Sequence, residues 1–375
     1  MIHSEQLRTK ILPIAGGKGG VGKSVTAASL GILLGSYGKR TVLVDLDLGG
    51  SNLHTYLGRK NNTLGIGNYL ASKDIAIGDI IQSTEHENLR FIPGDVLVEG
   101  VANVSYGQKR SLIAALAKLD VDFVLLDLGS GTHQNVIDFF LASNSGILVS
   151  TPQAPAILNT YGFLKNAVFR HVHRSTGSNK KVSEYLKKLH AETTANSTPP
   201  MTEIVARIKK LGKNIGTEVE DFLKDFKPHL ILNMARSHQD LSIARSLRDL
   251  SRKNLDIELA CLGGVHYEPE VNRAVTEQRP FITGAGSCTA GLQLDRIAQK
   301  LVHSPEFPDM PLDLDIYQDS FELAGIEMES DGDPEAAGEA GDLRPEDLLE
   351  VMAAQKKEIQ ELRQTIHNLT VGGLR

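Results

Sequence analysis

The sequence predicts a doubly wound α/β fold, in which helices flank both faces of a mainly parallel sheet. Strand-like and helix-like segments alternate along most of the chain, as they do in successive βαβ units. A glycine-rich phosphate-binding motif stands between the first of these strands and the first helix. Carboxylates close two later apolar strands, and ligands bind at that end of the strands in such sheets.

The expected strands are short apolar runs rich in β-branched residues, and the expected helices repeat apolar residues at helical spacing. Strands are predicted at Ile11–Ala15, Thr41–Leu46, Leu89–Pro93, Asp122–Asp127, Gly146–Ser150, His229–Asn233 and Leu259–Val265. Helices are predicted at Lys23–Tyr37, Gly107–Leu119 and Leu241–Arg252. The phosphate motif therefore has the strand–loop–helix context in which such motifs function.

The phosphate motif G-x-x-x-x-G-K-S runs from Gly17 to Ser24. Its glycines let backbone N–H groups point at a β-phosphate, and the positive end of the following helix adds to the anion site. We expect Lys23 to reach the β- and γ-phosphates and the Ser24 hydroxyl to ligate Mg²⁺. The nucleotide-binding residues predicted here are Gly17, Lys18, Gly19, Gly20, Val21, Gly22, Lys23, Ser24 and Val25.

Three aspartates follow apolar strands near this motif. Asp45 and Asp47 close the second strand, and Asp127 ends a later one. Carboxylates beside phosphates repel the substrate unless Mg²⁺ lies between them, so Asp45, Asp127 and Ser24 are candidate metal-site residues. A capping or solvated carboxylate pair is the alternative interpretation.

Composition limits the classes of function. The 375 residues are 41% hydrophobic and 23% charged, as in ordinary soluble globular proteins. The net charge of −6 disfavours a globally basic nucleic-acid binder. The N-terminus lacks a signal-peptide pattern, and no apolar run reaches the roughly 18 residues of a membrane span. We expect a cytoplasmic protein, with peripheral contact at the inner membrane or a cell pole left open.

A second lysine, Lys18, precedes the Gly-Gly-x-Gly-Lys-Ser run, and this loop resembles the deviant Walker A motif of the MinD/ParA family. Residues 43–53 resemble the first switch segment of that family, and residues 127–131 resemble its D-x-x-x-G second switch. Residues 151–161 are similar to the T-P-E-P-T-x-x-x-D-A-Y segment of the FlhG/FleN branch. The resemblance covers residues 10–165 and 228–303.

The resemblance implies a P-loop NTPase fold of the SIMIBI type and an ATP hydrolase that uses ATP and Mg²⁺. It implies three catalytic residues: Lys23 on the phosphates, Asp47 orienting the attacking water, and Lys18 reaching across an ATP-dependent homodimer to the partner's nucleotide. Asn233 matches the strand-end asparagine that reads adenine. Slow turnover is expected, because the output of such an enzyme is a conformation.

Two regions lie outside the resemblance. We expect an ATPase domain over residues 1–305, with a basic helical insertion at about 170–225; residues 165–213 carry eleven Lys or Arg against three Glu. Residues 306–343 are expected to form an acidic, disordered linker. Residues 344–375 are expected to form a C-terminal helix that pairs as a coiled coil or docks, since apolar residues follow a short heptad pattern there.

The leading hypothesis is a nucleotide-controlled dimerisation switch that positions or regulates a flagellar, division or polar assembly. Its protein partner would contact the C-terminal helix or the switch surface. The alternative is ParA-like, non-specific DNA binding by the basic insertion, although that insertion could equally be solvated or pair with the acidic tail. A less favoured alternative is an Mrp-like iron–sulfur carrier, which needs a paired-cysteine motif that Cys261 and Cys288 do not supply.

Overall fold

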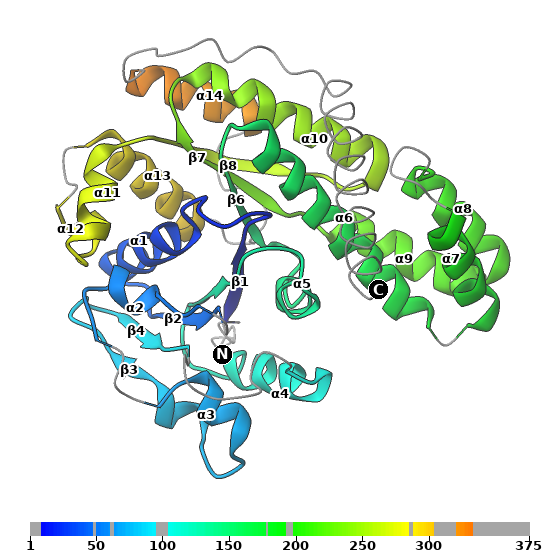
Figure 1. Ribbon diagram of the computed structural model, residues 1–375, viewed down its shortest axis with the longest axis horizontal. Helices are drawn as coiled ribbons and strands as arrows, with labels where there is room; N and C mark the ends of the chain where they lie inside the picture. Colours follow the sequence, from blue (N-terminus) through cyan, green and yellow to red (C-terminus); the bar gives the residue numbers. More distant parts are fainter. Residues whose placement is uncertain are drawn as a thin grey trace, which may run out of the picture.

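The computed structural model describes residues 9–47, 50–60, 64–94, 104–177, 179–192, 198–284, 288–303 and 320–332 (Figure 1). Within these residues one sheet runs through the molecule in the order β3-β4-β2-β5-β1-β6-β7-β8. Its strands are β1 (Lys10–Ala15), β2 (Thr41–Leu46), β3 (Gln82–Ser83), β4 (Leu89–Ile92), β5 (Phe123–Leu128), β6 (Ile147–Ser150), β7 (His229–Ala235) and β8 (Ala260–His266).

All neighbouring strands are parallel except β3, which pairs antiparallel with β4 at one edge. The doubly wound, mainly parallel α/β fold is therefore confirmed. Each predicted strand is present, with bounds within one or two residues of the expected ones. The antiparallel edge was not predicted, because a two-residue strand leaves no periodic pattern in the sequence.

Helices fill the connections between the strands. In the first half of the chain they are α1 (Lys23–Ser36), α2 (Leu53–Tyr56), α3 (Ile66–Ala71), the 3₁₀ turn η1 (Ile77–Ile80), α4 (Tyr106–Leu116) and α5 (Gln134–Phe140). They continue as α6 (Ala154–Thr176), α7 (Lys180–Glu192), α8 (Met201–Leu211), α9 (Lys213–Asp225), η3 (His238–Asp240) and α10 (Leu241–Leu255). The last are α11 (Pro269–Thr276), α12 (Phe281–Gly284), α13 (Thr289–His303) and α14 (Ser320–Asp331).

Alternate residues of the central strands face two different helical layers. In β5, Val124 and Leu126 belong to the apolar core shared with α6 and α10, whereas Leu125 belongs to the core shared with α1 and α13. In Figure 1 the helices α1, α11, α12 and α13 gather on one side of the sheet, and α6 and α10 lie on the other. Because both faces are covered, the central strands read as continuous apolar runs.

The segment expected as a basic helical insertion, residues 170–225, holds the end of α6 and the three helices α7, α8 and α9. These helices stand to one side of the sheet in Figure 1, and Leu186, Ile208 and Val219 join them to the apolar core that α6 and α10 share with the sheet. Over residues 170–225 eleven Lys or Arg stand against seven Asp or Glu, so the segment is net basic, and residues 180–225 alone hold nine against seven. The additional acids lie on α9, where Glu220 pairs with Lys209 of α8 at 2.7 Å.

The segment expected as an acidic linker contains a docked helix. Within residues 306–343 the structure describes 320–332, and Ser320–Asp331 form α14, whose apolar side packs on β8. Phe321, Ala324 and Met328 are each at most 1% exposed. Two acids of α14, Glu327 and Asp331, pair with cations of α13, so part of the charge that suggested disorder is neutralised in the fold. The predicted helix 344–375 and its heptad pattern lie outside the described residues.

Candidate active site

The phosphate loop connects the end of β1 to the start of α1. Gly22 precedes the first residue of α1 with φ +87°, and Gly20 has φ +80°, so both need the left-handed backbone that glycine adopts without strain. Gly22 also lies against the side chain of Asn233, because an added Cβ would come within 2.2 Å of Asn233 Nδ2. The loop geometry that the glycine pattern predicts is therefore present, and the N-terminus of α1 is open to an anion.

The loop also packs tightly on α6. A Cβ added to Gly17 would come within 2.2 Å of the backbone carbonyl carbon of Asn159. Gly17 is thus required by a close backbone approach, which the motif alone does not reveal. The two lysines of the loop differ in exposure: Lys23 is buried, at 8% exposed, whereas Lys18 is exposed.

Two buried carboxylates lie side by side at the ends of their strands. Asp45 on β2 and Asp127 on β5 are register partners and are 0% and 2% exposed. Asp45 Oδ2 accepts a hydrogen bond from Ser51 Oγ at 2.6 Å and from the N–H of Leu53 at 3.2 Å. Ser51 thus helps to hold the Asp45 carboxylate, a role that the position of carboxylates at strand ends does not predict.

The carboxylate of Asp127 has fewer hydrogen-bond partners than that of Asp45. Its Oδ1 is buried and has no hydrogen-bond partner among the described residues. Burial, and next the charge of Asp45, raise the pKa of Asp127, against a hydrogen bond with Ser24 and the charge of Lys23. Burial likewise raises the pKa of Asp45, against its hydrogen bonds. A bound cation would favour the charged form of both of these adjacent acids.

The donor set fits Mg²⁺. The candidate ligands are hydroxyl and carboxylate oxygens from Ser24, Asp45 and Asp127, and hard divalent cations prefer oxygen. An unpartnered buried oxygen on Asp127 gives the ion, or a water bound to it, a place to bind. The structure thus brings together the three residues predicted as the metal site.

Asp47 belongs to the first segment predicted as a switch and lies against the second. It is half-buried, and an added Cβ on Gly129 would come within 3.1 Å of Asp47 Oδ1. The next residue of the second segment, Ser130, has its Oγ 3.7 Å from the position of a Cβ on Gly19. The phosphate loop and both segments therefore meet at one edge of the sheet, and residues 48–49 lie outside the described part.

Asn233 does not lie free in the expected base site. Its Nδ2 donates a hydrogen bond to the Val21 carbonyl at 2.9 Å. Beside it a cavity of 180 Å³ opens, with apolar walls from Val25, Val265, Phe281 and Leu294 and polar groups that include His266 and Tyr267. Gly20 and Gly22 line the same cavity, so it is continuous with the phosphate loop and suits a nucleotide base.

Comparison with protein families agrees with this geometry. The model of the CobQ/CobB/MinD/ParA nucleotide binding domain matches residues 12–281. The chain belongs to this family. The similarity extends over most of two relatives: the septum site-determining protein MinD of Buchnera aphidicola is 24% identical over 73% of this chain and 93% of its own length. The antiactivator FleN of Pseudomonas aeruginosa is 22% identical over 78% and 86%.

Other relatives of this MinD/ParA-type chain match over a shorter stretch. A MinD-type septum site-determining protein of Chlorella vulgaris is 30% identical, and the match spans 40% of this chain and about half (52%) of that relative. Among solved structures, MinD of Pyrococcus horikoshii in complex with Mg-ADP superposes with a TM-score of 0.53 at 23% identity, covering 78% of this chain and 96% of that one. The predicted family is thereby confirmed, and the predicted use of ATP and Mg²⁺ is supported.

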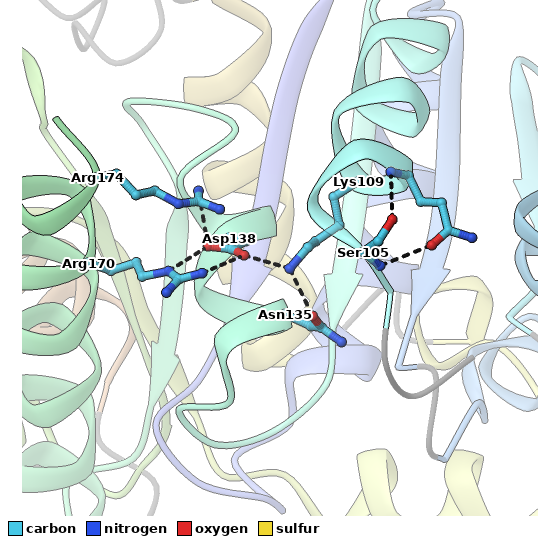
Figure 2. A network of polar contacts seen from close by, with 7 residues as sticks. Ser105, Lys109, Asn135, Asp138, Arg170 and Arg174 are labelled. Carbon is cyan, nitrogen blue, oxygen red and sulfur yellow. Dashed lines mark hydrogen bonds and ion pairs between the residues drawn. The ribbon is translucent and has the colours of Figure 1, made fainter. Parts of the chain in front are cut away.

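An ion network braces the helix that follows the second switch segment of this MinD/ParA-type chain (Figure 2). The carboxylate of Asp138 on α5 accepts from Arg170 at 3.0 Å and pairs with Arg174 at 3.1 Å, both on α6. It also pairs with Lys109 of α4 at 2.5 Å, and Lys109 donates to Asn135 at 2.9 Å. With its side chain 2% exposed, Asp138 joins three helices through one buried anion. Sequence reasoning missed it, because its partners are distant in the chain.

Several remaining features bear on the alternatives for this MinD/ParA-type chain. Cys261 is buried and Cys288 half-buried, and neither forms a disulfide. Across the described ranges, no helix is both long and apolar enough to cross a membrane. The exposed lysines of α7 include Lys180, Lys181 and Lys187. In Figure 1, α7 stands apart from β1 and α1, which flank the phosphate loop.

Proposed function

We propose that this chain is a Mg²⁺-dependent ATPase whose nucleotide state controls dimerisation, and that its dimer positions or regulates a cellular assembly. The observation that carries the proposal is the buried Asp45–Asp127 pair, with an unpartnered Asp127 oxygen, beside Lys23 and Ser24. Two adjacent buried acids are costly in an empty protein. A divalent cation held by these acids and Ser24 would remove that cost.

Each of these residues has a separate role in hydrolysis. The loop amides and the buried Lys23 bind the β- and γ-phosphates, and Ser24 and Asp127 hold Mg²⁺ directly or through water. The ion, when bound, neutralises charge on the phosphate oxygens. Asp47, which lies against Gly129, orients the attacking water at the γ-phosphate. Asp45 holds the first switch segment in place through Ser51 and Leu53.

The exposure of Lys18 supports a shared site. Lys23 of the same loop is buried and serves its own subunit, whereas Lys18 is exposed and precedes Gly19, which faces Ser130 of the second switch segment. An exposed cation next to a phosphate site is placed to reach the nucleotide of a second copy. We infer that ATP joins two copies of the chain through this face, and that slow hydrolysis separates them.

The relatives indicate the kind of process. One is named a septum site-determining protein and another an antiactivator, FleN. By analogy we propose a flagellar, division or polar assembly as the target, reached through a protein partner that reads the dimeric state. The switch surface and the C-terminal segment are the proposed contacts for this partner.

Non-specific DNA binding is a second candidate. The exposed lysines Lys180, Lys181 and Lys187 of α7 favour it, because lysine–phosphate contacts need no base recognition. The acids of α9 oppose it, since they bring residues 180–225 close to charge balance. We therefore favour a protein partner over DNA. A salt titration of binding to duplex DNA, with and without ATP, tests this order.

The ATPase proposal is tested by phosphate release from ATP with and without Mg²⁺. We expect slow, Mg²⁺-dependent release by the wild type and at least about a hundredfold less by Asp47→Ala, since loss of water positioning removes a general-base contribution. Asp79→Ala changes an acid on η1, outside the site, and serves as the control. Equal release by Asp47→Ala and wild type, or release that needs no Mg²⁺, would contradict the proposal.

A further inference from the structure

The last described helix ends two hydrogen bonds away from a residue that lines the base cavity. Asp331, the final residue of α14, accepts a hydrogen bond from Gln293 Nε2 of α13 at 2.8 Å. Gln293 is 2% exposed, and its Oε1 accepts from the N–H of His266 at 2.8 Å. His266 ends β8, is 1% exposed, and lines the base cavity. A continuous chain of hydrogen bonds therefore runs from α14 to the cavity.

The partners in this series of hydrogen bonds fix the orientation of the Gln293 amide. Only its nitrogen can donate to the Asp331 carboxylate, so its oxygen must face the backbone N–H of His266. The same nitrogen lies 2.8 Å from His266 Nδ1. Because the amide nitrogen is only a donor, Nδ1 must accept, and the imidazole is held as the neutral tautomer with its proton on Nε2.

We propose that Asp331 is a positioning residue of the nucleotide base cavity, acting through Gln293 and His266. This inference rests on the proposed nucleotide binding. Without the Asp331 acceptor, the Gln293 amide loses one of its three hydrogen bonds, and only its two bonds with His266 at the end of β8 still orient it. The wall that contacts the base then loses its fixed position, and nucleotide affinity falls.

The coupling must act in both directions. If docking of α14 strengthens nucleotide binding by some factor, nucleotide binding strengthens docking of α14 by the same factor. Docking of α14 would therefore be firmer in the nucleotide-bound protein. This couples α14, through Gln293 and His266, to the state of the active site.

The contacts of α14 supply a matched control. Glu327, one turn before Asp331, pairs with Lys300 of α13 at 2.6 Å, as Asp331 pairs with Arg296 at 2.8 Å. Both acids tie the same two helices together. Lys300 donates to the Leu262 carbonyl in the middle of β8, and neither residue lines the base cavity. The hydrogen bonds from Asp331, in contrast, lead to His266, which does line it.

The test compares three variants of the full chain by their Kd for a fluorescent ATP analogue with Mg²⁺. We expect Asp331→Ala to bind at least about fivefold more weakly, a typical coupling factor. Asp331→Asn should restore affinity, because its side-chain oxygen still accepts from Gln293, and Glu327→Ala should bind like the wild type. Melting temperatures without nucleotide report any general loss of α14 docking.

A second readout follows the coupling itself. Hydrogen exchange of the α14 amides should slow on addition of the ATP analogue in the wild type and in Glu327→Ala, and should not slow in Asp331→Ala. Equal affinity losses in Asp331→Ala and Glu327→Ala, or unchanged affinity in Asp331→Ala, overturns the inference while leaving the ATPase proposal intact. Failure of the wild type to bind the analogue overturns both.

Discussion

Asp45 and Asp127 occupy the same register position on the neighbouring parallel strands β2 and β5, and both are buried. This pairing follows from the fold, because parallel strands end at one edge of the sheet. Its consequence is electrostatic: without a cation, two acids share a dry site, and each disfavours the charged form of the other. The stability of the metal-free protein should therefore depend on Asp127.

We expect the metal-free protein to lose stability as pH rises, and Asp127→Asn to remove much of that loss. Burial and Asp45 raise the pKa of Asp127 from 3.8 to about 8. Between these values the folded state holds a proton that the unfolded state has released, so unfolding becomes easier as pH rises through this window and levels off above it. Thermal melts from pH 5 to 9, with and without Mg²⁺ and ATP, check this. A wild type and variant with parallel pH profiles would contradict it.

The two lysines of the phosphate loop should have separable effects. Lys23→Ala removes the buried phosphate contact and should abolish ATP binding. Lys18→Ala should leave ATP binding by the single subunit little changed, because this side chain is exposed. It should weaken dimerisation by about 2–5 kcal/mol, as expected for loss of one charged partner at an interface. Sedimentation equilibrium with ATP measures the effect, and loss of ATP binding in Lys18→Ala would refute the division of roles.

Gly17→Ala should disrupt the phosphate loop. The added methyl group would come within 2.2 Å of the Asn159 backbone, and backbone cannot move aside as a side chain can. A cost of about 1–3 kcal/mol is expected from such overpacking, with weaker ATP binding. The control is Gly162→Ala on α6, the helix that contains Asn159. An added Cβ at Gly162 meets no atom within 4 Å, and this variant should stabilise α6 by about 0.5–1 kcal/mol. Full ATP affinity in Gly17→Ala would show that the loop does not need this contact.

The Asp138 network should contribute strongly to stability. Asp138→Asn leaves Lys109, Arg170 and Arg174 without their shared anion and should lower the free energy of unfolding by about 3–5 kcal/mol. The matched control is Asp120→Asn, which removes an exposed partner of Arg40 and should have no measurable effect. Urea denaturation at neutral pH compares the two variants. Equal effects would mean that burial gives the network no special role.

Much of the site could be predicted from local sequence, because its parts are local. The glycine pattern determines the loop, and the carboxylates follow apolar runs that become strands, so Asp45 and Asp127 were placed correctly. Contacts between distant segments could not be predicted in this way. The approach of Gly17 to Asn159, the bond from Ser51 to Asp45 and the Asp138 network all depend on how helices pack.

The acidic segment shows how composition can mislead. Its density of charge predicted a disordered linker, yet residues 320–331 form α14. The missed signal was the spacing of Phe321, Ala324 and Met328, which repeats at three and four residues and marks one apolar face. Its receiving surface was also hidden: Gly264 leaves room for Met328, since a Cβ there would come within 1.9 Å of Met328 Sδ.

The most direct test of the central proposal is the mass of the Asp47→Ala variant in solution, measured by light scattering during gel filtration. This variant should bind Mg·ATP without hydrolysing it, and so remain in the joined state. We predict twice the mass of a single chain with Mg·ATP, and the mass of one chain with Mg·ADP or without nucleotide. A mass that is the same under all three conditions would contradict the nucleotide-controlled dimer.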